Sequence, residues 1–115
     1  MLVLALNDRE SILAEKNFEL KFFNLGAGRR CVEVTVLETR SYVFRVNGIG
    51  DADVGAVGPD ESLRLDIRFG SILRLCGCDI RFDRHGTSGV KCMIAAPKSI
   101  RFTRPAQHGT SLRSA

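Results

Sequence analysis

Two cysteines stand one residue apart in the carboxyl-terminal half of the chain, at Cys76 and Cys78. Together with His85 and Cys92 they supply side chains of the types that bind metal ions or act as nucleophiles. Zinc sites, however, prefer two or more residues between paired cysteines, and a free cysteine on an alternating strand packs as a small hydrophobic residue. We therefore interpret the cysteines as core residues, and we expect no metal site, no cofactor and no catalytic residues. The chain is not expected to be an enzyme.

Basic residues are concentrated in the second half of the chain. Residues 64–115 carry 10 basic and 3 acidic side chains, whereas residues 1–63 carry 7 basic and 10 acidic ones. Thirteen of the 17 basic residues are arginine, whose guanidinium group binds phosphate with two parallel hydrogen bonds. A basic half suits a polyanionic partner such as a nucleic acid, although a solvated basic face explains the same pattern.

Apolar and polar residues alternate along most of the chain, and a period of two is typical of β-strands with one buried face. Glycine-rich segments and an Asn-Gly pair separate the alternating runs, as expected for turns. The pattern predicts an all-β domain of short strands, and a helix within residues 10–22 is the weaker interpretation. Residues 47–61 lack periodicity and predict a long loop. The alternating runs are residues 18–22, 32–36, 42–46, 63–67, 78–82 and 100–102.

The chain length of 115 residues is that of one ordinary domain. No apolar run approaches the roughly 20 residues of a membrane helix, and the apolar residues 1–6 lack the basic segment that begins a signal peptide. We therefore expect a cytoplasmic protein with reduced cysteines and no membrane partner.

The two ends of the chain carry recognisable motifs. The first strand begins with the aliphatic residues Leu2 and Leu4, and a Glu-Ser-Ile segment follows at residues 10–12. Near the other end, an Ala-Pro-Lys turn at residues 96–98 leads into a short strand that ends at Arg104. Together these segments resemble the carbon storage regulator (CsrA/RsmA) family, small bacterial RNA-binding proteins that repress translation.

The resemblance implies a small CsrA-like β-barrel or sandwich that forms an intertwined homodimer, with the first and last strands of different subunits side by side. On this interpretation residues 1–104 form a single domain, and an insertion at about residues 15–74 adds antiparallel strands. Residues 105–115 would be a disordered tail. The implied function is translational regulation through GGA-containing mRNA leaders, with mRNA or a small regulatory RNA as the partner.

The resemblance also implies an RNA-binding edge along the first and last strands. Arg104 would contact phosphate or bases, and Leu4 would contribute its backbone and its packing. The family usually has two basic residues where this chain has Leu6 and Asn7, which weakens phosphate binding. The remaining expected contacts at this edge are Leu6, Asn7, Lys98, Arg101 and Thr103.

The departure from the family pattern leaves other interpretations open. One is a protein-interaction or assembly module on a CsrA-like scaffold that has lost RNA binding. Another is an unrelated β-barrel or β-sandwich.

Overall fold

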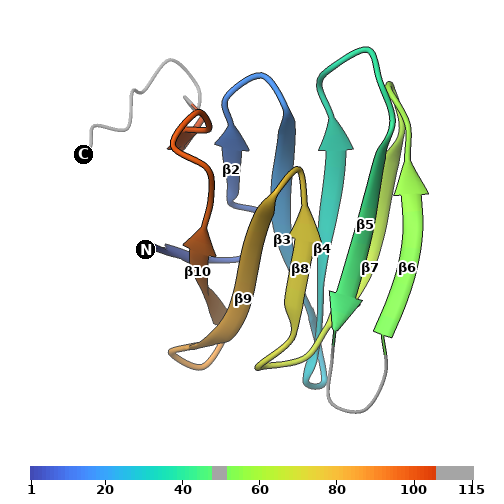
Figure 1. Ribbon diagram of the computed structural model, residues 1–115. Helices are drawn as coiled ribbons and strands as arrows, with labels where there is room; N and C mark the ends of the chain where they lie inside the picture. The colour runs from blue at the N-terminus through green and yellow to red at the C-terminus, as the bar shows by residue number, and fades with distance from the viewer. Residues whose placement is uncertain (48–51, 106–115) are drawn as a thin grey trace.

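The structure is a computed structural model that describes residues 1–47 and 52–105. The regular elements in this part of the chain are all β-strands (Figure 1). The first six are β1 (Leu2–Leu6), β2 (Ser11–Ala14), β3 (Phe18–Gly26), β4 (Arg29–Val36), β5 (Tyr42–Asn47) and β6 (Ala52–Val57). The other five are β7 (Ser62–Ile67), β8 (Ile72–Leu75), β9 (Cys78–His85), β10 (Gly89–Ala95) and β11 (Phe102–Thr103).

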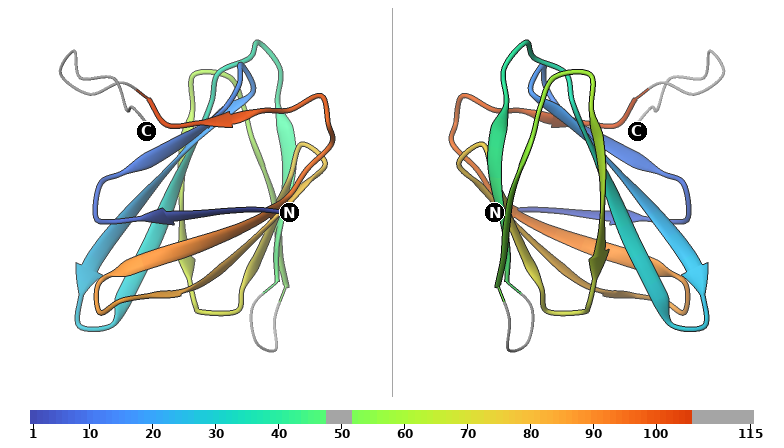
Figure 2. Two further views of the ribbon diagram at one scale, coloured as in Figure 1. Left: turned by 90° about the vertical axis from the view of Figure 1, so that its left-hand side faces the viewer. Right: turned by 90° about the vertical axis from the view of Figure 1, so that its right-hand side faces the viewer.

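The strands form two antiparallel sheets, which confirms the predicted all-β fold. One sheet has the order β1-β10-β9-β8-β5-β6, and the other has the order β11-β2-β3-β4-β7. Figure 2 shows the two sheets crossing at an angle around a common interior. The predicted tail from residue 106 onward and the glycine of the predicted Asn-Gly turn lie outside the described residues.

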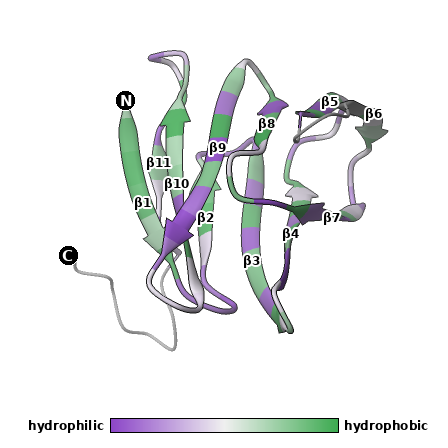
Figure 3. Cartoon of the chain, turned by 90° about the horizontal axis from the view of Figure 1, so that it is seen from below, coloured by the Kyte–Doolittle hydropathy of each residue, from purple (hydrophilic) through white to green (hydrophobic). Residues whose placement is uncertain are grey.

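The core lies between the two sheets, where the alternating apolar residues point inward. Its largest fully buried side chains include Phe18, Phe22 and Phe82. The hydropathy colours alternate along the strands in Figure 3, as the period of two predicts. Burial of a side chain of this size stabilises the fold by about 1.5–3 kcal/mol. Because inward and outward residues alternate, the charged side chains between these positions remain at the surface.

The prediction of a loop over residues 47–61 is wrong, because β6 lies within that segment. β6 is an edge strand that pairs only with β5. Gly55 lies against the ring of Phe44, so that a Cβ atom at this glycine would come within 2.6 Å of Cζ. Val54 on the same strand is 60% exposed. A strand that needs a glycine and exposes a valine lacks the alternation by which strands are recognised.

The segment expected to be an insertion, residues 15–74, contributes strands to both sheets. It supplies β3, β4 and β7 to one sheet, and β5, β6 and most of β8 to the other. Both sheets follow the same plan, with three consecutive strands in the middle and strands from the other half of the chain beside them. No helix within residues 1–47 and 52–105 has the length and apolar character to cross a membrane.

Candidate nucleic-acid interface

The first strand leaves one of its edges open. β1 stands at the end of its sheet and pairs only with β10, where Leu4 lies opposite Cys92. Met1 is 85% exposed and Val3 is 50% exposed, so the start of the strand presents apolar side chains to solvent. An edge strand also presents backbone N–H and C=O groups without partners in the sheet. These groups can pair with another extended chain or with base edges.

The last strand lies beside this open edge. β11 pairs with β2 of the second sheet, with Phe102 opposite Ala14, and the residue that follows β11 reaches back to β1. Nη2 of Arg104 donates a hydrogen bond of 2.7 Å to the carbonyl oxygen of Ala5. The two ends of the chain therefore meet through a side chain, and this contact is made within one molecule.

A carboxylate orients the Arg104 side chain. Oε1 of Glu10 lies 3.8 Å from Nη1 of Arg104 and accepts a hydrogen bond of 2.8 Å from the backbone N–H of Asn7. The side chains of Arg104 and Glu10 are 34% and 36% exposed, so water screens this ion pair. The guanidinium group has five N–H donors, which leaves some of them free for a ligand.

A groove of about 550 Å³ runs between the start of β1 and the segment that leads into β11. Lys98, Arg101 and Thr103 line it together with Met1 and Leu2. Two cations beside an apolar strip can hold a phosphate while a base lies on the apolar side chains.

The segment before β11 is fixed in place by the turn between β2 and β3. The backbone N–H of Arg101 donates to Oε1 of Glu15 at 3.0 Å, and the N–H of Glu15 donates to the carbonyl of Arg101 at 2.9 Å. The rings of Phe102 and Phe18 meet edge to face, with their centroids 6.3 Å apart. These contacts hold the cationic side of the groove rigidly against the core.

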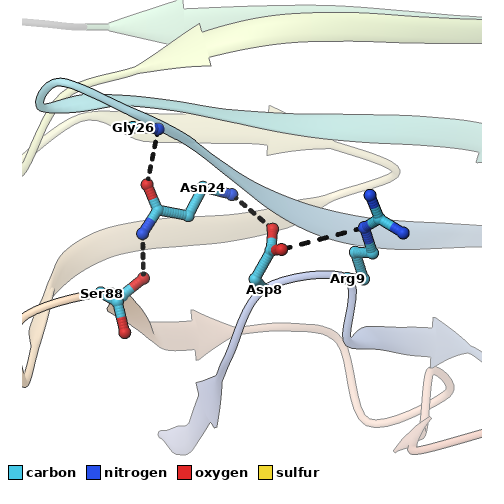
Figure 4. Close-up of polar contacts among 5 residues, drawn as sticks. All are labelled: Asp8, Arg9, Asn24, Gly26 and Ser88. Carbon is cyan, nitrogen blue, oxygen red and sulfur yellow. Dashed lines mark hydrogen bonds and ion pairs between the residues drawn. The ribbon is translucent and has the colours of Figure 1, made fainter.

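The turn after β1 is held by a polar network that joins three segments (Figure 4). The backbone N–H of Asn24 donates to Oδ1 of Asp8 at 2.7 Å, and Nδ2 of Asn24 donates to the carbonyl of Ser88 at 3.2 Å. Oδ1 of Asn24 accepts from the N–H of Gly26, and Asp8 pairs with Arg9 at 3.8 Å. The turn after β1 is thereby tied to the β3–β4 hairpin and, through Asn24, to the turn between β9 and β10.

The structure brings most of the predicted contact residues to this edge, with one correction. Arg104 touches β1, and Lys98, Arg101 and Thr103 line the groove. Leu4 is half-buried and packs against the core. Asn7 is exposed at the end of β1.

The correction concerns Leu6, which is 0% exposed. Only its backbone can contact a ligand, because its side chain fills the core where the family pattern has a cation. Sequence reasoning missed the roles of Ala5, Glu10 and Phe102. Glu10 belonged to the recognised motif, but nothing in the motif shows that it pairs with Arg104.

A second cationic hollow, of about 470 Å³, lies at the far end of β7. Arg30, Arg68 and Arg84 line it together with Phe69. The guanidinium groups of Arg30 and Arg84 lie over the Phe69 ring, 4.8 and 4.7 Å from its centroid. Nε of Arg30 is buried without a hydrogen-bond partner. This hollow is a competing place for an anion.

The cysteines occupy apolar surroundings. Burial raises the pKa of Cys92 to about 12, although Arg104 opposes the shift. Burial likewise raises the pKa of Cys76 to about 12 and that of Cys78 to about 11. Such thiols are protonated at neutral pH and are therefore weak nucleophiles and weak metal ligands. The described residues contain no group of three or more His, Cys, Asp or Glu side chains that could hold a metal ion.

Comparisons with known proteins do not add to this picture. No protein-family model matches the chain, and neither a curated protein nor a solved structure matches it. The features that bear on function are therefore the open β1 edge, Arg104 and the groove beside them.

Proposed function

We propose that the protein binds single-stranded RNA along the β1 edge and regulates translation by occupying GGA-containing mRNA leaders. The observation that carries this proposal is the contact between Arg104 and the edge of β1, beside a groove that Lys98 and Arg101 line. On this proposal the protein is a cytoplasmic regulator without enzymatic activity, as the resemblance to the carbon storage regulator family implies.

The chemistry of the edge suits an unpaired RNA loop. Unpaired bases expose their Watson–Crick edges, which the free N–H and C=O groups of an edge strand can read. The arginine can contribute charge-assisted hydrogen bonds to a phosphate or to a guanine, and the neighbouring cations can neutralise the backbone. Exposed Met1 and Val3 offer apolar surface against which a base can pack.

Fluorescence anisotropy with two matched hairpins tests the proposal. One hairpin carries GGA in its loop, and the other carries CCU. We expect salt-sensitive binding to the GGA hairpin and weaker binding to the CCU hairpin. Arg104→Ala should weaken GGA binding by about 10- to 100-fold, because hydrogen bonds to charged groups contribute roughly 1.5–3 kcal/mol.

Arg74→Ala is the matched control for this variant. Arg74 lies on β8, is exposed, and pairs with Asp79 at 3.3 Å. Its replacement removes the same charge but should change GGA binding much less than Arg104→Ala does. Equal and weak binding of wild-type protein to both hairpins at physiological salt would reject sequence-specific recognition. Loss of binding in Arg84→Ala rather than in Arg104→Ala would move the RNA site to the hollow around Phe69.

The exposed apolar start of β1 favours one other function, that of a protein-interaction module. An extended segment of a partner protein can add to an open edge strand by main-chain hydrogen bonding. The carboxylate of Glu10 already pairs with Arg104, which lowers the positive charge available to RNA. This function predicts a partner that protects the β1 amides from hydrogen exchange, together with no preference between the two hairpins.

A further inference from the structure

The two halves of the chain are built on the same plan. β1 to β5 correspond to β7 to β11, strand by strand, and β6 lies between the two sets. In one sheet β1 and β5 flank β10-β9-β8, and in the other β7 and β11 flank β4-β3-β2. Each half therefore places its own outer strands beside the middle strands of the other half.

The strand registers agree as well as the strand order. Ile12 lies opposite Leu20 in the first half, and Leu73 lies opposite Ile80 at the corresponding place in the second. The outer strands also correspond. Phe102 lies opposite Ala14 in one sheet, and Phe44 lies opposite Leu75 at the equivalent place in the other. Two further cross-strand pairs have equivalents in the other half. The pair Leu4 and Cys92 corresponds to Leu65 and Val32, and the pair Phe22 and Val32 corresponds to Phe82 and Cys92.

The turns after β1 and β7 repeat the same backbone hydrogen bonds. Arg9 and Gly70 occupy equivalent places and both have positive φ, at 68° and 93°. The N–H of each donates at 2.7 Å to the carbonyl of a core phenylalanine, Phe22 or Phe82. The N–H groups of these phenylalanines donate in turn to Glu10 and Ser71, at 2.9 and 3.0 Å. Side-chain differences at these places leave the backbone arrangement unchanged.

We propose that the chain is a covalent pair of equivalent five-strand units that exchange strands within one molecule, and that only one of its two equivalent edges is open to a ligand along both of its strands. The open edge is that of β1 and β11. At the equivalent edge, β6 covers the outer side of β5, whereas β7 stands at the end of its sheet. The protein is then a monomer with one binding edge per chain, in place of the homodimer that the resemblance implies.

β6 distinguishes the two edges. It pairs with the outer side of β5 over six residue pairs, from Tyr42–Val57 to Asn47–Ala52. β11 pairs only with β2, so no strand in the described part of the chain is hydrogen-bonded to its outer side. A ligand that reads backbone groups can therefore reach β11 but not β5.

The second edge has also lost the arginine. Phe44 and Phe102 are equivalent by register, so Val46 stands where the other edge has Arg104. Val46 is 8% exposed and belongs to the core. The β5 side of this edge therefore lacks both the free backbone and the cation that β11 and Arg104 supply at the other edge.

Two measurements that need no RNA test the closure of β5 by β6 and the monomeric state. Size-exclusion chromatography with light scattering should give the mass of one chain, 12.7 kDa. Hydrogen exchange monitored by NMR should show strong protection of the β5 amides that face β6 and fast exchange of the amides on the open edge of β1. Twice the chain mass, or fast exchange along both sides of β5, would overturn the inference.

A third measurement counts the RNA sites and depends on the proposed function. Titration of the GGA hairpin above its Kd should saturate at one RNA per chain. Arg104→Ala should weaken this binding by about 10- to 100-fold, and Arg45→Ala on the covered strand β5 should leave it unchanged. Saturation at two RNAs per chain would overturn the inference. Absence of binding by a monomer with protected β5 amides would reject the RNA-binding function and support the fused, one-edge architecture.

Discussion

Replacement of Gly55 by alanine tests how β6 is attached to the rest of the sheet. A Cβ atom at this position would lie 2.6 Å from Cζ and 2.8 Å from Cε2 of Phe44, whereas ordinary van der Waals contacts begin at 3.4 Å. The ring of Phe44 is 7% exposed and belongs to the core, so it has little room to turn away. Either the ring must leave its position or β6 must move off β5.

Two effects of opposite sign determine how much Gly55→Ala changes the free energy of unfolding. Overpacking of a buried ring costs about 1–3 kcal/mol. Alanine in a strand regains about 0.5–1 kcal/mol relative to glycine, because glycine loses more backbone entropy on folding. The steric cost is larger, so we expect Gly55→Ala to lower the free energy of unfolding by roughly 1–2 kcal/mol. For a domain of this size, the Tm should fall by about 4–8 °C for each kcal/mol lost.

Urea denaturation of four proteins provides the assay. They are the wild type, Gly55→Ala, Phe44→Leu and the double variant, which together form a double-mutant cycle. The smaller side chain of Phe44→Leu should remove most of the cost of Gly55→Ala. Val54→Ala is the control on the same strand, since Val54 is 60% exposed and should matter little. If Gly55→Ala were as stable as the wild type, the reasoning about Phe44 would be refuted.

Three further predictions follow from other parts of the molecule. Leu6→Ala should destabilise the protein by about 2–5 kcal/mol in urea denaturation, because Leu6 is fully buried. A loss of RNA affinity without a loss of stability would contradict the place of Leu6 in the core. Glu10→Gln should raise affinity for the GGA hairpin about two- to fivefold by removing a screened ion pair with Arg104, and unchanged or weaker binding in anisotropy would argue against this competition. Cys92 should make the protein less stable at high pH, because burial raises its pKa from 9.0 to about 12 in the folded state. Its contribution to the free energy of unfolding is therefore present in full below pH 9 and is lost as the pH rises toward 12. Urea denaturation at pH 8 and pH 10 should show a smaller pH effect in Cys92→Ala than in the wild type, by up to about 1.4 kcal/mol per pH unit, and equal slopes would contradict the shifted pKa.

The alternating strands were predictable from the sequence because a one-sided strand needs apolar residues at every second position. Five of the six alternating runs lie within strands, and the run at residues 100–102 reaches strand β11 only at Phe102. The resemblance implied that the first and last strands of different subunits lie side by side. In the structure β1 pairs with β10 and β11 with β2, and the two ends meet within one molecule through the side chain of Arg104. The sequence did not reveal that β1 pairs with β10, because antiparallel pairing between distant strands leaves no local signal.

The equivalence of the two halves was hidden by changes that preserve volume rather than identity. Small Ala14 lies opposite large Phe18 in the first half, whereas large Leu75 lies opposite small Cys78 in the second. All four side chains are nearly or fully buried. A core accepts such exchanges as long as the total volume is maintained. The repeated plan is therefore visible in the registers but not in a comparison of residue letters.

The pairing of β1 with β10 has a consequence for the order of folding. Leu2 lies opposite Ile94, so β1 is made long before the strand with which it pairs. During synthesis β2, β3 and β4 can pair with one another, but β1 waits with its apolar side chains exposed. Contacts of such long sequence separation slow folding, since a long loop must close before they form. The pairing of β1 with β10 therefore delays completion of this sheet until β10 has been made.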